Sequence, residues 1–183
     1  MVSVIVPTRD QPAFLRTVIE GLEATRWQPL EIVIVDNDST DPQALDILDR
    51  SPHRVERAPI PFNFPRLVNR GASVASGDVL VFLNNDIELT DPDWIEPLIE
   101  LTQYADVGPV GALLNYPDGT IQHCGMAIGP DGPMHPLRGI QRDRAPAGLA
   151  LVPGERTAVT AACMAIKSTV FWQLGGFEPL LAP

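Results

Sequence analysis

The amino-acid sequence predicts an α/β fold with a mainly parallel central sheet flanked by helices. Three runs, at residues 2–6, 32–35 and 79–83, are apolar except for Ser3, and they have the length and hydrophobicity of strands that are buried on both faces. Segments with helical periodicity separate these runs, and such alternation is typical of parallel sheets. Polar residues directly follow each run. Because an open α/β sheet binds ligands at the carboxyl ends of its strands, these polar ends predict a binding site.

Four helices are expected in the first half of the chain. The first carries Phe14, Val18 and Leu22 as an apolar stripe at helical spacing. In the second, Asp41 before Pro42 is typical of an N-cap followed by a first-turn proline. We expect the four helices at residues 13–24, from Pro42 through Leu48, from Pro65 to a stop near Gly77, and from Asp91 through Ile99, with a weak strand near Val55.

The second half of the chain has a different character, because glycine and proline interrupt its apolar segments. The run Tyr-Pro-Asp-Gly-Thr at residues 116–120 is a turn signal. Ser168 is expected to cap a short final helix, and Gly175 to end it. The remaining elements are expected to be strands at residues 107–114 and 121–128, a loop at 129–153, and a strand within 157–166.

The composition indicates a globular protein that does not bind nucleic acid. The chain has 183 residues, of which 45% are hydrophobic, as expected for one domain with a core. Its 23 acidic and 13 basic residues give a net charge of −10, whereas nucleic-acid binding requires a basic face. No signal peptide or membrane-spanning run is recognisable. We therefore expect a cytoplasmic location, with Cys124 and Cys163 as free thiols.

The common nucleotide and catalytic motifs are absent from the sequence. It contains no dinucleotide fingerprint, P-loop, nucleophile elbow or zinc-type Cys/His spacing. What remains is two polar strand ends, at residues 36–38 and 84–86. A carboxylate there can accept hydrogen bonds from a base or a ribose, and another can hold a divalent metal that bridges phosphates. Since Mg²⁺ usually takes only one or two protein carboxylates, Asp86 alone is sufficient in principle.

Five motifs spread over nearly the whole chain carry a family resemblance. They are Val-Ile-Val-Pro-Thr-Arg-Asp at 4–10, Val-Asp-Asn-Asp-Ser-Thr-Asp at 35–41, Asn-Arg-Gly-Ala at 69–72 followed by Ser-Gly-Asp at 76–78, Phe-Leu-Asn-Asn-Asp-Ile at 82–87, and Gly-Gly-Phe-Glu at 175–178. Through them the chain resembles family 2 glycosyltransferases, which have the GT-A fold. The segments 63–64 and 118–123 resemble the rhamnosyltransferase-like, polysaccharide-building branch.

The resemblance implies transfer of a sugar from a UDP- or dTDP-sugar donor to a hydroxyl acceptor, by inversion and with Mn²⁺ or Mg²⁺. The acceptor would be a glycan or a lipid-linked glycan, and a membrane-bound acceptor would fit a peripheral location at a membrane. The resemblance places the metal on Asp86, and it implies that residues 160–163, and also His123, face the acceptor or the donor sugar. The residues implied for nucleotide binding are Pro7, Thr8, Arg9, Asp36, Asn37, Asp38, Asn69 and Asn85.

The resemblance also divides the single domain, residues 1–183, into a nucleotide-binding half at 1–115 and an acceptor-side half at 116–183. The first half departs from the family pattern at one position. Where the family has Asp-x-Asp, this chain reads Asn84-Asn85-Asp86, so one carboxylate is lost. The affinity for a metal is therefore expected to depend on the bound nucleotide.

The second departure concerns the catalytic base. In the family, an acidic pair that contains the base follows several residues after the Gly-Gly-Phe-Glu motif, and this pair would fall beyond Pro183, the last residue of the sequence. The resemblance therefore predicts an acceptor-side half that is incomplete at its C-terminus, with the base beyond Pro183. Within the sequence the catalytic residue is unknown, and Glu178 and His123 are weak candidates.

Other interpretations of these patterns stay open. Asp36 and Asp38 also suit a cap on the next helix, Asp86 suits a turn, and His123 suits a structural role. A nucleotide-sugar binding fragment without transferase activity is the main functional alternative, because the base region is missing. A sugar nucleotidylyltransferase is disfavoured, since the glycine-rich phosphate loop after the first strand is absent.

Overall fold

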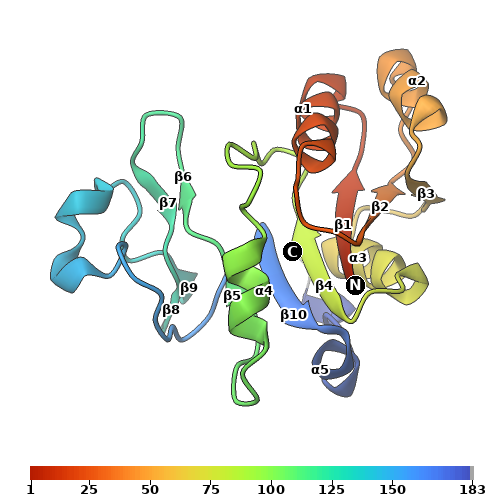
Figure 1. Cartoon of the computed structure of the whole chain (residues 1–183). Coiled ribbons are helices and arrows are strands. Elements are labelled where there is room, and N and C mark those ends of the chain that lie inside the picture. Colours follow the sequence, from red (N-terminus) through yellow and green to blue (C-terminus); the bar gives the residue numbers. More distant parts are fainter. Residues whose placement is uncertain (182–183) are drawn as a thin grey trace.

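A six-stranded sheet forms the centre of the computed structural model, which describes residues 1–181 (Figure 1). Its strand order is β3-β2-β1-β4-β10-β5, in which β1 to β4 are parallel and β10 runs antiparallel to both of its neighbours. The predicted α/β fold with a mainly parallel sheet is confirmed. The strand bounds are β1 Val2–Thr8, β2 Leu30–Asp36, β3 Arg54–Arg57, β4 Val79–Leu83, β5 Val110–Gly111 and β10 Cys163–Lys167.

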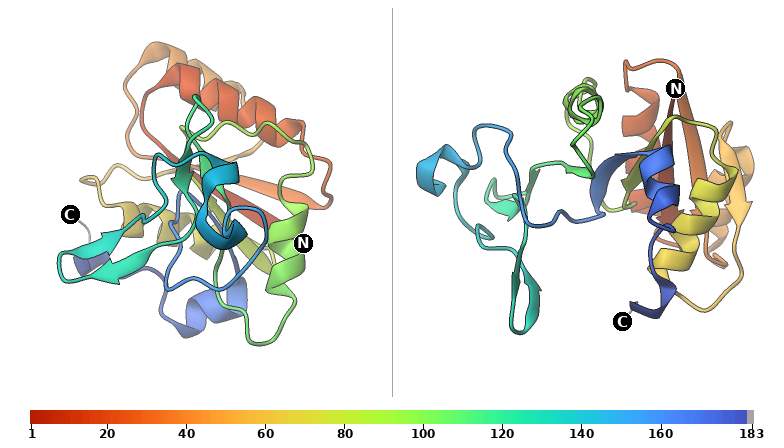
Figure 2. Two further views of the ribbon diagram at one scale, coloured as in Figure 1. Left: turned by 90° about the vertical axis from the view of Figure 1, so that its left-hand side faces the viewer. Right: turned by 90° about the horizontal axis from the view of Figure 1, so that it is seen from below.

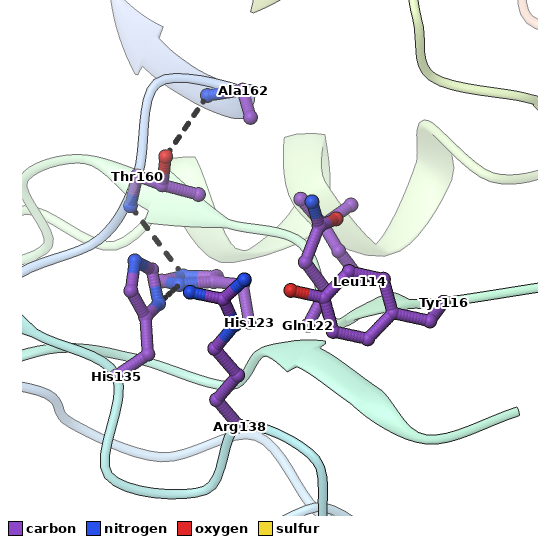
Figure 3. A pocket seen from close by; sticks show the side chains of 8 residues that line it. All are labelled: Leu114, Tyr116, Gln122, His123, His135, Arg138, Thr160 and Ala162. Carbon is purple, nitrogen blue, oxygen red and sulfur yellow. Dashed lines mark hydrogen bonds between the residues drawn. The ribbon is translucent and has the colours of Figure 1, made fainter.

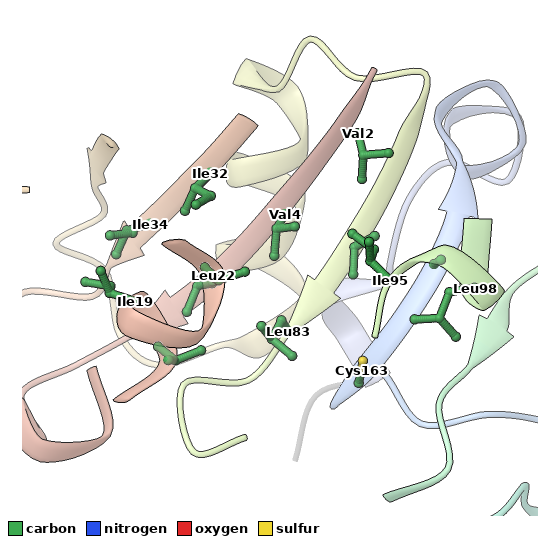
Figure 4. Packing of buried hydrophobic residues seen from close by; sticks show 14 of the residues in the cluster. Val2, Val4, Ile19, Leu22, Ile32, Ile34, Leu83, Ile95, Leu98 and Cys163 are labelled. Carbon is green, nitrogen blue, oxygen red and sulfur yellow. The ribbon is translucent and has the colours of Figure 1, made fainter. Parts of the chain in front are cut away.

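Helices cover both faces of this sheet (Figure 2). On one face, α1 (Pro12–Glu23), α2 (Pro42–Arg50) and the segment leading into α4 (Glu96–Thr102) pack on the side chains of alternate strand residues, as Figure 4 shows for Val4, Ile34 and Leu83. On the other face, α3 (Phe64–Val74) and α5 (Ser168–Gln173) pack around Phe82. No helix within residues 1–181 combines the length and the hydrophobicity needed to cross a membrane.

The second half of the chain builds a smaller, separate layer of hairpins beyond the β5 side of the sheet (Figure 1). One hairpin pairs β6 (Leu114–Asn115) with β7 (Ile121–His123), and another pairs β8 (Ala127–Gly129) with β9 (Gly132–Met134). The predicted turn at residues 116–120 joins the first pair, where Tyr116 N–H donates to Thr120 O at 2.8 Å. Short 3₁₀ helices follow at Arg142–Arg144, Pro146–Gly148 and Pro179–Leu181.

The structure corrects several predicted elements. The helix expected from Asp91 begins only at Glu96, and Pro97 therefore lies in its first turn, where no helical hydrogen bond is lost. The single strands expected at 107–114 and 121–128 are each two short strands, and the strand within 157–166 begins only at Cys163. These segments are rich in glycine and turn residues, so the register breaks repeatedly.

Helix ends also differ from two of the predictions. Ser168 is the first residue of α5, and no side chain caps this helix within the described part of the chain. Helix α3 ends at Val74, and Gly77 serves a different purpose from a helix stop. A Cβ at Gly77 would lie 2.6 Å from Ser3 N, so glycine is required there for the close approach of β1. The prediction at Asp41 is confirmed, because its carboxylate accepts from the amides of Gln43 and Ala44.

Candidate functional site

The ends of β1 and β2 lie side by side at the carboxyl edge of the sheet. Thr8 and Asp36 are register partners, and Asn37 N–H donates to Thr8 O at 2.8 Å. Just beyond the strands, Asp10 Oδ1 accepts from Thr40 N–H at 2.6 Å and from Asp41 N–H at 2.7 Å. These two backbone bonds hold the pKa of Asp10 below its usual range. These hydrogen bonds join residues 8–10 to residues 36–41, and we call this unit the platform.

Asp36, at the end of β2, is the buried residue of this platform and has no exposed surface. Its Oδ1 accepts from Ser39 N–H at 3.2 Å, and its Oδ2 accepts from Arg57 Nη1 at 2.5 Å. Arg57 also contacts Asp49, at 3.1 Å. A buried carboxylate is tolerated when it is paired and hydrogen-bonded, and both conditions hold here. Asp36 thus organises the loop after β2.

The next two residues, Asn37 and Asp38, have different environments at the end of β2. Asn37 is buried, and its Nδ2 donates to Ala58 O at 2.9 Å and to Ile60 O at 2.7 Å. Asp38 adopts a left-handed conformation with φ of 61°, which aspartate tolerates better than most residues. Its carboxylate is exposed. In the sequence Asp36-Asn37-Asp38, Asp38 is therefore the acidic group that solvent can reach.

The end of β4 adjoins the same platform. Asn85 Nδ2 donates to Thr8 Oγ1 at 3.0 Å, so the ends of β1 and β4 are directly linked. Asp86 follows as an exposed carboxylate, and Arg9 is an exposed cation at the end of β1. Pro7 is half-buried within β1, next to Thr8. The structure thus brings together predicted site residues from three strands.

The donor groups at the end of β4 fit a metal that is shared with a ligand. Within the described residues 1–181, no group of three or more His, Cys, Asp or Glu side chains is placed to hold a metal ion. Asp86 offers one accessible hard oxygen ligand beside the amide of Asn85. Mg²⁺ commonly keeps one or two carboxylates and completes its octahedron with phosphate oxygens and water. The site therefore suits a cation that arrives with a diphosphate.

Asn69 lies on α3 and contacts the C-terminal segment. Its Nδ2 donates to Phe177 O at 2.7 Å, and its Oδ1 accepts from Phe177 N–H at 2.9 Å. Both halves of the amide therefore hold the Gly-Gly-Phe-Glu segment. The exposed Glu178 follows, and its carboxylate accepts from Leu180 N–H at 2.9 Å.

The catalytic base was predicted to lie beyond Pro183, which is outside the residues that the structure describes. The described part of the chain ends at Leu181, so neither Pro183 nor any position after it can be placed relative to the strand ends. Of the two weak candidates within the sequence, Glu178 belongs to the segment held by Asn69, and His123 lies in the hairpin layer. The structure therefore does not test the prediction of a base beyond Pro183.

His123 lines a pocket of about 150 Å³ in the second half of the chain (Figure 3). It is only 2% exposed, and its Nε2 accepts from the backbone N–H groups of Gly125 at 3.3 Å and Thr160 at 3.4 Å. Burial, aided by the nearby His135 and Arg156, lowers the pKa of His123 to about 4. His123 is therefore neutral at pH 7. The pocket is lined by Leu114, Tyr116, Gln122, His123, His135, Arg138, Thr160 and Ala162.

Residues 160–162 connect this pocket to the end of β4. Ala162 N–H donates to Thr160 Oγ1 at 3.3 Å inside the pocket. On its other side, Ala162 O accepts from Asn84 N–H at 2.9 Å. Cys163, next in the chain, is buried in β10, and burial raises the pKa of its thiol to about 12. The pocket is thus connected through Ala162 to Asn84, which lies two residues before Asp86.

Sequence reasoning missed several residues that shape these sites. Arg57 lies in the weak strand β3, and nothing in its local pattern indicates a partner in β2. His135 and Arg138 lie in a glycine- and proline-rich loop that carried no motif. Asp10 belongs to the motif at residues 4–10, and this motif was the one signal that could have identified it.

Comparisons with known proteins identify the family and the fold of this chain. The model of the Glycosyl transferase family 2 matches residues 3–175. The chain is 39% identical over 189 residues to the O-antigen biosynthesis protein RfbC of Myxococcus xanthus and 36% identical over 197 residues to protein y4gI of Sinorhizobium fredii (strain NBRC 101917 / NGR234). Each alignment covers 97% of this chain, but only 14% and 20% of those proteins. The chain therefore spans a fifth or less of the length of these relatives.

Solved structures share the fold. The mannosyltransferase PcManGT from Pyrobaculum calidifontis, in complex with GDP-Man and Mn²⁺, aligns with a TM-score of 0.68 at 17% identity, over 97% of this chain and 47% of that one. Glucosyl-3-phosphoglycerate synthase from Mycobacterium tuberculosis, in complex with UDP, aligns with a TM-score of 0.52 at 20% identity, over 63% and 45%. These likenesses establish a GT-A-type fold. From the family match and the sequence identity, the chain belongs to glycosyl transferase family 2.

Proposed function

We propose that this domain transfers a sugar from a nucleotide-diphosphate donor to a hydroxyl acceptor in O-antigen or polysaccharide biosynthesis. The observation that carries the proposal is the meeting of three polar strand ends, linked by the hydrogen bond from Asn85 to Thr8. This edge of an open α/β sheet is where nucleotides bind. The family membership, and the O-antigen role named for the Myxococcus relative, support the same conclusion.

The donor nucleoside is assigned to the platform formed by the ends of β1 and β2. Asp38 presents an accessible carboxylate that can accept from a base N–H or from ribose hydroxyls, while the buried Asp36 fixes the loop that positions it. Arg9 supplies an exposed positive charge for the donor. The donor base is expected to be uracil or thymine, and the solved relatives with GDP-Man and with UDP make guanine the alternative to test.

The diphosphate and its cation are assigned to the end of β4. Asp86 would hold Mn²⁺ or Mg²⁺ together with the donor phosphates, and Asn85 would lie beside the sugar. When bound, such a cation neutralises charge on the departing diphosphate. The proposed reaction is an inverting displacement, in which the acceptor oxygen attacks the anomeric carbon as the bond to the diphosphate breaks.

His123 is assigned a positioning role and not that of the base. Its Nε2 accepts two backbone N–H groups, and its pKa of about 4 leaves it a weak proton acceptor at pH 7. Glu178 is exposed and follows Phe177, which Asn69 holds, and within residues 1–181 no hydrogen bond or salt bridge links Glu178 to the three strand ends. The base therefore stays a prediction for the region beyond Pro183.

The test is calorimetric titration of this chain with UDP, dTDP and GDP, each with and without Mn²⁺, for the parent and for Asp86→Asn and Asp38→Asn. We expect the parent to bind a nucleotide more tightly when Mn²⁺ is present. Asp86→Asn should lower the nucleotide affinity about tenfold and remove the effect of Mn²⁺, whereas Asp38→Asn should lower the affinity about tenfold and keep that effect. A matched control is Asp131→Asn, an exposed carboxylate in the hairpin layer. Binding of none of the nucleotides, or equal loss in all three variants, would refute the donor site.

Turnover is tested separately, because a fragment that only binds a nucleotide sugar would pass the titration. Release of UDP, dTDP or GDP from the matching sugar nucleotide is measured with the parent chain and a polysaccharide acceptor fraction. Nucleotide release that requires the acceptor supports transfer. Binding without release, with activity restored in a chain that extends beyond Pro183, would instead identify a donor-binding portion of the whole enzyme.

A further inference from the structure

The pocket around His123 and Arg138 differs chemically from the rest of this acidic chain. Although the chain has a net charge of −10, no carboxylate of the described residues lines the pocket. The lining side chains are instead an arginine, two histidines, a tyrosine, a glutamine and a threonine, with apolar residues between them. Arg138 can only donate hydrogen bonds, and Tyr116, Gln122, His135 and Thr160 can donate as well as accept. The pocket is therefore suited to a ligand that is rich in acceptors.

Arg138 lines this pocket, and no carboxylate of the described residues pairs with its positive charge. Its guanidinium carbon lies 5.6 Å from the centre of the Tyr116 ring, which is a cation–π arrangement. Within residues 1–181, no carboxylate lies within salt-bridge distance of Arg138. The planar fork of arginine suits bidentate binding of carboxylate and phosphate, and stacking on an aromatic ring keeps that fork ordered.

The hydrogen bonds of the two histidines fix a second hydrogen-bond donor in the pocket, besides Arg138. Because His123 Nε2 accepts two backbone N–H groups, neutral His123 carries its proton on Nδ1. That nitrogen lies 3.0 Å from His135 Nδ1, to which it donates (Figure 3). Neutral His135 then carries its own proton on Nε2. The backbone thus sets the tautomers of both rings, and His135 is presented as a donor.

The size and position of the pocket limit what it can hold. A volume of about 150 Å³ is well below the ~300 Å³ at which pockets begin to hold drug-sized ligands. The pocket therefore suits one small group of a larger ligand, such as a phosphate or a sugar carboxylate. Residues 160–162 place the pocket next to the end of β4.

We propose that this pocket is a subsite for an anionic group of the acceptor, either a phosphate or a sugar carboxylate. Placing the group on the acceptor rests on the proposed function, whereas the preference for an anion rests only on the residues of the pocket. Arg138 would bind the anion as a bidentate cation, and Tyr116, Gln122 and His135 would add hydrogen bonds. The subsite would favour acceptors that carry the charge close to the reacting hydroxyl.

The test is a titration followed by ¹H–¹⁵N NMR, with inorganic phosphate, glucuronate and neutral glucose as probes. We expect phosphate or glucuronate to shift the amides of Gly125 and Thr160, which bind His123, with a Kd of roughly millimolar size. Glucose should bind at least tenfold more weakly. A stronger response to phosphate indicates a phosphorylated acceptor, and a stronger response to glucuronate indicates an acidic sugar.

Arg138→Gln removes the cation at an exposed position, and Arg144→Gln is the matched control on an exposed arginine outside the pocket. We expect the first variant to weaken anion binding at least tenfold, and the second to change it less than twofold. Glucose binding as tight as glucuronate, no shift with either anion, or equal effects of both variants would overturn the subsite. Nucleotide binding in the same samples reports the donor site separately, so failure of one assignment is distinguishable from failure of the other.

Discussion

Asn85 Nδ2 donates to Thr8 Oγ1 at 3.0 Å, and this bond joins two strands whose residues are 77 positions apart in the sequence. It links Asn85, the residue before the metal candidate Asp86, to the platform formed by β1 and β2. The two halves of the proposed donor site are thus fixed relative to each other before a ligand binds. Such preorganisation lowers the cost of binding, because less ordering is left to occur.

Thr8→Val removes the hydroxyl acceptor while nearly conserving volume, so Asn85 loses its partner. We expect nucleotide affinity to fall about fivefold, which corresponds to roughly 1 kcal/mol for one hydrogen bond. Thr8→Ser keeps the hydroxyl and should bind nearly as well as the parent. Calorimetry with UDP and Mn²⁺ measures both variants, and equal affinity of Thr8→Val and Thr8→Ser would contradict the role given to this bond.

Arg57→Met leaves the buried carboxylate of Asp36 without its cation. Loss of a buried pair costs ~3–5 kcal/mol, and we discount this to about 1–3 kcal/mol because the Arg57 side chain is 45% exposed. Arg50→Met breaks an exposed i,i+4 pair with Asp46 and should cost less than about 0.5 kcal/mol. Urea unfolding measures both variants. A loss at Arg57 no larger than that at Arg50 would show that Asp36 does not depend on this partner.

Asn69→Ala removes both hydrogen bonds to the backbone of Phe177. We expect faster hydrogen exchange of the Phe177 amide and a loss of about 1–3 kcal/mol in the free energy of unfolding, since two polar backbone groups lose their partners. Amides in the centre of β1 serve as the internal control, because they exchange through global unfolding. Their exchange should become faster only by the factor that the loss in the free energy of unfolding predicts. Unchanged exchange at Phe177 would mean that the aromatic contacts of its ring hold this segment without Asn69.

The buried His123 predicts a loss of stability in mild acid. Its pKa is lowered from 6.5 to about 4 in the folded state, so between these values the unfolded chain binds more protons. The contribution of the neutral His123 ring to the free energy of unfolding is complete above pH 6.5. It is lost progressively as the pH falls toward 4, by an amount on the order of 3 kcal/mol. Urea unfolding from about pH 7.5 to about pH 4.5 should show a shallower pH dependence for His123→Gln than for the parent. Parallel curves would contradict the assignment of a neutral, buried ring.

The part of the fold predictable from sequence is the part set by local patterns. Continuous apolar runs identified β1, β2 and β4, because strands buried on both faces need no polar side. Proline and capping signals identified α2 and α3 in the same way. The hairpin layer was predicted less well, because strands of two or three residues are too short to show a period.

What the sequence determined by itself is therefore the α/β class with a mainly parallel sheet, the strands β1, β2 and β4, the helices α1 to α3 and the polar ends of three strands, since these follow from hydrophobic order along the chain. Only the tertiary structure decided that Asp36 is buried on Arg57 and that Asp38 is the accessible carboxylate. It also decided that Asn69 holds Phe177, 108 residues away, and that His123 meets His135 in a pocket that no described carboxylate lines. Side-chain pairing depends on how segments that are far apart in the sequence pack together, and the local sequence around a residue does not show which distant segment it will contact.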